Sequence, residues 1–62
     1  MCESTVYLEE NGNRIEIMKD VAKIEVTADG IICYDIIGEK RLVKGAKLKV
    51  ANLMDHSIIF QK

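Results

Sequence analysis

Few residues in this chain are suited to chemistry, and the most distinctive of them is Cys2. The chain opens Met-Cys-Glu-Ser-Thr-Val-Tyr-Leu, which places a thiol about two residues before a segment of strand-forming composition. Deprotonated thiols bind Ni, Cu, Zn or Fe. If Met1 is removed, the amine and thiolate of Cys2 can chelate one metal ion, and amide nitrogens of Cys2 or Glu3 can complete a square plane. That plane suits Ni(II) or Cu(II), whereas zinc prefers a tetrahedron. The alternative is an inert thiol or a small apolar residue at the rim of the domain.

The other thiol and the one imidazole are weaker candidates for metal binding. Cys33 lies in the most apolar segment of the chain, which predicts a core residue. His56 follows Asp55 in a polar turn, and a carboxylate beside a histidine can orient a metal ligand. An exposed histidine with no metal role is the favoured interpretation, because the chain has no second histidine to pair with it.

A run of positive charge offers an alternative function in nucleic-acid binding. Small β barrels can present such a patch to the phosphates of RNA. The aromatic residues available for base stacking are few, and the chain carries a net charge of −1, so a solvated surface is the favoured interpretation. The cluster consists of Lys40, Arg41, Lys44, Lys47 and Lys49.

Length and composition restrict the class of protein. A chain of 62 residues with 48% apolar residues allows one domain, residues 1–62, with a small core. Self-association into a homodimer, which metal binding could promote, would add buried surface. We expect no enzyme, because the sequence contains no phosphate-binding glycine loop, catalytic triad order or nucleophile elbow. We also expect no export signal and no membrane span, and therefore the reducing cytosol.

Alternation of apolar and polar residues predicts a series of short strands. Asn11-Gly12-Asn13 and Asp29-Gly30 are the turn signals of hairpins, and Lys19-Asp20 interrupts the pattern between two of the strands. The predicted strands cover residues 4–9, 14–18, 23–27, 31–37, 40–43, 47–53 and 57–60. We therefore predict an all-β fold, a six- or seven-stranded antiparallel meander that closes into a small barrel of SH3 or Sm size.

The whole pattern resembles the CooT family. These are small nickel-binding accessory proteins of carbon monoxide dehydrogenase, also catalogued as predicted RNA-binding proteins. The likeness rests on the Met-Cys start, a first strand containing Val6, a glycine-containing turn, Arg-Ile-Glu-Ile at residues 14–17 and the alternating strands that follow.

The resemblance implies a small β barrel, often dimeric, that holds nickel at the cysteine after the initiator methionine, here Cys2. It implies no metal role for His56, and Cys33 lies outside the motif. On this basis we expect a metallochaperone that binds Ni(II) at Cys2 and supports maturation of a nickel enzyme such as carbon monoxide dehydrogenase.

Overall fold

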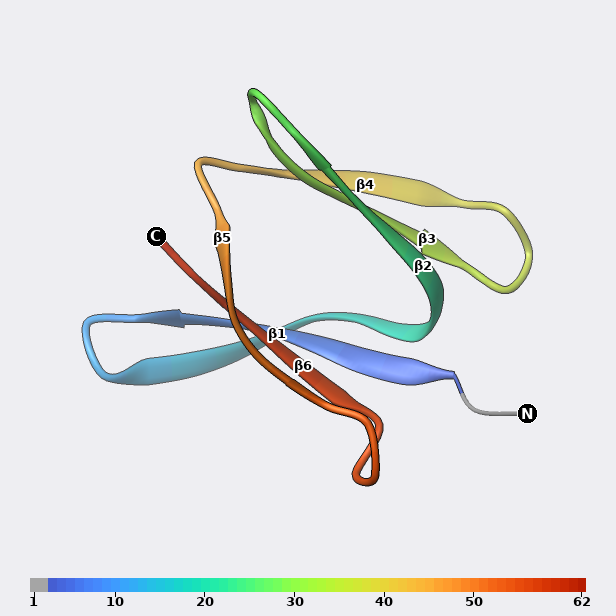
Figure 1. The fold of residues 1–62 in the computed structure, drawn as a ribbon, viewed down its shortest axis with the longest axis horizontal. Coiled ribbons are helices and arrows are strands. Elements are labelled where there is room, and N and C mark those ends of the chain that lie inside the picture. Colours follow the sequence, from blue (N-terminus) through green and yellow to red (C-terminus); the bar gives the residue numbers. More distant parts are fainter. Residues whose placement is uncertain (1–2) are drawn as a thin grey trace.

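The fold is all-β, as the alternating pattern predicted. The computed structural model describes residues 3–62, and every regular element in that range is a strand (Figure 1). None of these residues form a helix long and apolar enough to cross a membrane. The strands are β1 (Ser4–Glu10), β2 (Asn13–Thr27), β3 (Gly30–Asp35), β4 (Lys40–Lys44), β5 (Lys47–Asn52) and β6 (Ser57–Gln61).

Strand β2 corrects one prediction, because it joins two segments that the sequence indicated as separate strands. Its first half pairs with β1 as far as Val21, and its second half pairs with β3 from Val21 onward. The interruption at Lys19-Asp20 is real, since Asp20 has a φ of 56° and the register shifts on either side of Val21. The chain bends there without turning back, as at a β-bulge.

The strand order also differs from the predicted antiparallel meander. The sheet runs β4-β3-β2-β1-β6-β5, and β6 lies parallel to β1 while all other pairs are antiparallel. The predicted closure into a barrel is not confirmed, because β4 and β5 remain the two edges of the sheet. Hairpin signals report neighbours along the chain, whereas the β1–β6 pair joins distant segments that no turn signal links.

The core lies between the two halves of the bent sheet. One half contributes Val6 of β1 and Phe60 of β6, which are fully buried. The other half contributes the buried residues Ile31 and Cys33 of β3. The remaining buried apolar residues are Leu8, Val21, Val43, Ala46, Ile58 and Ile59. This core holds β1 at the centre of the sheet, between β2 and β6.

Candidate metal site

The predicted ligand Cys2 lies outside the described residues, but the strand that follows it is fixed on both sides. Ser4 pairs with Val21 of β2, and Thr5 pairs with Ser57 of β6. Strand β1 is therefore anchored from its first residues by two neighbouring strands. This supports the expectation that the strand next to Cys2 is a rigid part of the domain.

The turn that contains His56 lies directly beside the start of β1. The amide of Thr5 donates a hydrogen bond to the carbonyl oxygen of His56 at 2.9 Å. The turn is closed by Asn52, whose side-chain amide donates to the Asp55 carboxylate at 3.0 Å and whose side-chain oxygen accepts from the Asp55 amide at 3.1 Å. The Asp55 carboxylate therefore closes the turn, a role that differs from the histidine-orienting role considered from the sequence.

Cys33 is a core residue, as its apolar surroundings predicted. Its side chain is fully buried among the apolar residues of the sheet. Burial raises the pKa of the Cys33 thiol, and the nearby Arg41 only partly opposes that shift. A protonated, inaccessible thiol is a poor metal ligand, so the interior of the sheet offers no competing sulfur site.

The described part of the chain contains no side-chain cage for a metal ion. Across residues 3–62, no three His, Cys, Asp or Glu side chains come together in a group that could hold one.

The basic cluster predicted from the sequence is divided by the sheet. Arg41 and Lys49 both have structural partners: the Arg41 guanidinium donates to the carbonyl oxygen of Ile17 at 3.1 Å, and the Lys49 ammonium pairs with Glu9. Lys40 and Lys44 alternate with Arg41 along β4, and so lie on the opposite face of that strand. The alternation within β4 was the sequence signal that could have separated Arg41 from its neighbours.

The aromatic ring nearest the basic cluster is already covered. The Lys23 ammonium lies 4.2 Å from the centre of the Tyr34 ring, and the Tyr34 hydroxyl donates to the Glu25 carboxylate at 2.8 Å. The hydrogen bond to Glu25 raises the pKa of Tyr34, and desolvation of the hydroxyl adds a smaller rise. A cation on the ring face leaves less of it free for base stacking.

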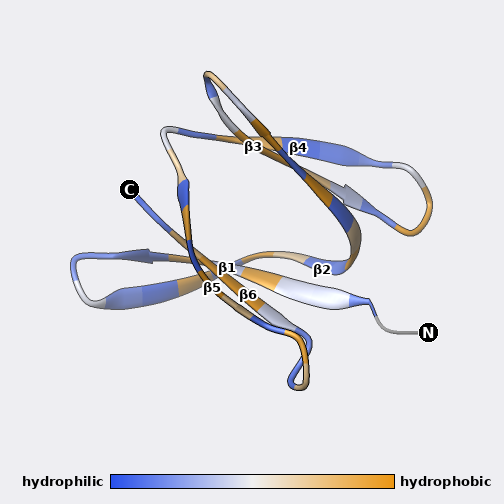
Figure 2. Cartoon of the chain, viewed as in Figure 1, coloured by the Kyte–Doolittle hydropathy of each residue, from blue (hydrophilic) through white to orange (hydrophobic). Residues whose placement is uncertain are grey.

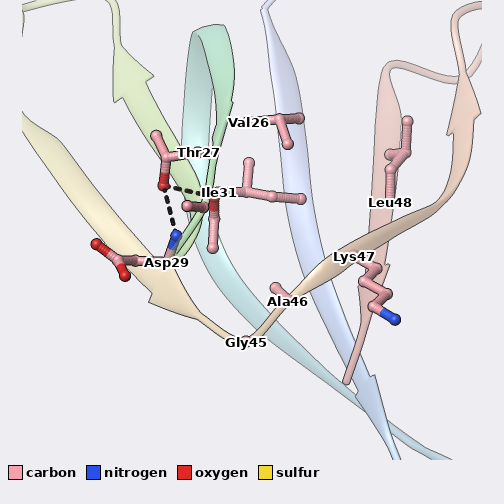
Figure 3. A pocket seen from close by; sticks show the side chains of 10 residues that line it. Val26, Thr27, Asp29, Ile31, Gly45, Ala46, Lys47 and Leu48 are labelled. Carbon is pink, nitrogen blue, oxygen red and sulfur yellow. Dashed lines mark hydrogen bonds between the residues drawn. The ribbon is translucent and has the colours of Figure 1, made fainter.

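The surface formed by residues 3–62 includes two hollows near the elements described above. The larger, of about 370 Å³, lies between the β2–β3 hairpin and the β4–β5 connection; Figure 3 shows Val26 and Ile31 on one side of it and Ala46, Lys47 and Leu48 on the other. The smaller, of about 220 Å³, is lined by Ser4, Val21, Ala22, Lys23, Ile24, Leu53 and Ile58. Of these two hollows, the smaller adjoins the start of β1.

Comparisons with known proteins identify one family. A family model described as CO dehydrogenase accessory protein CooT matches residues 1–61. The crystal structure of a protein assigned as CooT from Carboxydothermus hydrogenoformans has a TM-score of 0.88 and 24% sequence identity, with 98% of this chain and 97% of that chain covered. At this identity the likeness shows the fold. A search of curated proteins finds no significant match.

Proposed function

The chain belongs to the CooT family of CO dehydrogenase accessory proteins, and we propose that it binds Ni(II) through the thiolate of Cys2 and supports maturation of carbon monoxide dehydrogenase. Nickel is the cargo in this proposal. The observation that carries it is the contrast between the two thiols of the chain: Cys33 is fully buried and its pKa is raised, whereas Cys2 precedes a strand that both its neighbours hold in place.

The donor set follows from the residues near Cys2. The thiolate supplies sulfur, and the terminal amine or nearby backbone amides supply nitrogen. A site with so few side-chain ligands suits a protein that must release its ion to another protein, because a closed cage would retain it. A single thiolate is equally compatible with copper, so metal preference is part of the test.

We also propose a homodimer. Strand β5 is an edge of the sheet, all six of its residues are exposed, and they include the apolar residues Leu48 and Val50. An unpaired edge with apolar side chains favours pairing with another strand. Sedimentation of the protein with and without Ni(II) would give its mass and show whether the metal promotes association.

The experiment that tests the metal site is a titration with Ni(II). We expect thiolate-to-nickel charge-transfer absorption in the wild type, its loss in Cys2→Ser and its retention in Cys33→Ala, which removes the other thiol. Parallel titrations with Cu(II) and Zn(II) establish preference, and native mass spectrometry gives stoichiometry and the processing of Met1. An unchanged band in Cys2→Ser would overturn the assignment.

RNA binding through the basic cluster remains the alternative function. The divided cluster and the covered ring of Tyr34 favour the nickel proposal over it. Binding to phosphates would weaken steeply as salt concentration rises. Measurable RNA affinity at low salt that is lost in a Lys40→Ala, Lys44→Ala variant would favour the alternative.

A further inference from the structure

Two turns of the molecule carry large exposed apolar side chains. In the β3–β4 turn, Ile36 is 55% exposed and Ile37 76%, and in the β5–β6 turn, Leu53 is 74% exposed and Met54 91%. We call residues 36–37 and 53–54 the apolar turns. Figure 2 shows both in orange, whereas the β1–β2 turn at the opposite side is white and blue. Since turns generally favour Gly, Asn, Asp and Ser, these side chains need an explanation other than turn formation.

Both apolar turns flank the start of β1. Val21 pairs with Ser4 on one side and with Asp35 on the other, and the amide of Ile36 donates to the carbonyl oxygen of Asp20 at 3.0 Å. Leu53 lines the smaller hollow together with Ser4 and Val21. In Figure 1 the start of β1 lies between the two turns. The four exposed apolar residues of these turns therefore lie around the start of β1, where the chain leads to Cys2.

We propose that the apolar turns are the docking surface for the enzyme that receives nickel from Cys2, an inference that rests on the proposed function. An ion can pass directly between proteins only if the acceptor's ligands approach the donor's. Cys2 is bonded to Glu3, and two residues of extended chain reach at most about 7 Å. The acceptor must consequently sit against the surface around Glu3, with no long arm to bridge a gap.

The position of the two turns beside the start of β1 brings both within reach of one partner. A stable interface of ordinary size covers about 800 Å² on each partner, a patch roughly 30 Å across. The described residues measure only 31 × 24 × 15 Å. A partner centred on the start of β1 therefore reaches about 15 Å in each direction, which takes in the two turns that flank this point but leaves the far end of the long axis uncovered. Burying exposed apolar side chains in the covered part contributes to binding.

The charges of the two turns specify the chemistry of the partner. Residues 35–39 and 52–57 contain three carboxylates, on Asp35, Glu39 and Asp55, and no Lys or Arg. Two lysines adjoin them, Lys40 after Glu39 and Lys23 in the lining of the smaller hollow, so acidic groups are in excess. The partner surface should therefore be an apolar patch with Lys or Arg at its rim. A second copy in a two-fold interface would place these carboxylates opposite each other, so charge favours the client enzyme over self-association at this surface.

The test measures binding to immobilised, nickel-deficient carbon monoxide dehydrogenase. We expect Ile37→Glu and Met54→Glu each to weaken binding at least tenfold, and wild-type affinity to fall as salt concentration rises. Val26→Glu is the matched control, because Val26 is 72% exposed but lies beside the larger hollow, away from the start of β1. It should bind within about twofold of wild type, and all three variants should keep the Cys2-dependent nickel absorption.

Different outcomes would contradict the docking proposal and the nickel-binding proposal. Turn variants that keep the nickel band and bind the enzyme as tightly as wild type overturn the docking surface and leave the metal site standing. An equal loss of enzyme binding in Val26→Glu overturns the docking surface as well. Turn variants that change only the sedimentation of the free protein would assign this surface to a second copy and overturn the inference. A wild type without a Cys2-dependent band overturns the proposed function, and this inference with it.

Discussion

The amide nitrogen of Thr5 lies 2.9 Å from the carbonyl oxygen of His56, and this hydrogen bond ties the start of β1 to the β5–β6 turn. His56 adopts a φ of 54°, a left-handed conformation that is uncommon for residues with a side chain. The one histidine of the chain is consequently held near the strand that follows Cys2. Nothing in the sequence around residue 56 indicated this proximity.

That proximity leads to a prediction about the nickel ligands. Because the proposed donors are a thiolate and backbone or terminal nitrogens, His56→Asn should keep the charge-transfer band and the nickel affinity within about threefold of wild type. Asparagine tolerates the left-handed conformation better than most residues, so the turn should persist. Titration with Ni(II) followed by absorption checks this, and loss of the band in His56→Asn would make the imidazole a ligand.

The buried state of Cys33 can be tested by its reactivity. The thiol is fully buried and burial raises its pKa, and alkylating reagents attack the thiolate. In the Cys2→Ser variant, iodoacetamide should therefore leave the native protein unlabelled and add one group after denaturation in urea. Mass spectrometry gives the count. Rapid labelling of the native variant would contradict the burial of Cys33.

Local patterns in the sequence predicted the strands well but not how they pair. The alternation at Ile15 and Ile17 placed a strand correctly, and Asp29-Gly30 lies at the turn between β2 and β3. The parallel contact of β1 with β6 was missed because it depends on packing between distant segments. Closure of the sheet into a barrel was predicted but is not confirmed. Period-two alternation does not show whether the two edge strands meet.

Burial was predicted less well at the edges of the sheet. Leu48 and Val50 have the alternation of core-facing residues, yet they are 47% and 41% exposed because β5 has only one neighbour. Ile36 and Ile37 were assigned to a strand, but the strand ends at Asp35, whose carboxylate accepts the Ile37 amide at 3.0 Å. An apolar run therefore continued into a turn, and the exposed surface it creates could not be seen from periodicity.

The pH dependence of stability should report the ion pairs of Glu9. Lys49 and Arg14 hydrogen-bond to the Glu9 carboxylate and hold its pKa below the ordinary value of 4.5. A lowered folded-state pKa gives stability that is present above about pH 4.5 and is lost as pH falls through the folded-state value. In urea unfolding, the free energy of unfolding of wild type should exceed that of Glu9→Gln at pH 7, and the difference should shrink as pH falls below 4.5.

The control for this measurement is Glu10→Gln, which removes one negative charge from the neighbouring position and leaves both Glu9 ion pairs intact. Because the Glu9 pairs lie at the surface, salt screens them, so the difference between wild type and Glu9→Gln should also shrink in 1 M NaCl. A difference that does not shrink as pH falls below 4.5 would show that Glu9 acts through packing rather than charge.

Gly30 should be the glycine whose substitution destabilises the fold most. It has a φ of 149°, and an added Cβ would overlap the carbonyl oxygen of Val43 and lie 2.9 Å from Cα of Lys44. These are backbone atoms of the paired strand β4, so they cannot move aside without breaking the β3–β4 ladder. We expect Gly30→Ala to lower the free energy of unfolding by about 3 kcal/mol or more.

Gly12→Ala is the matched variant for Gly30→Ala, because Gly12 also has a positive φ, 80°, but an added Cβ there meets no atom within 4 Å. Only the backbone strain remains, so the expected loss is about 1 kcal/mol. Urea unfolding of both variants gives the comparison. Equal losses would mean that strain alone sets the cost and that β4 does not pack against Gly30 as closely as described. A much larger loss in Gly30→Ala would confirm that the close approach of β3 and β4 requires a residue without a side chain.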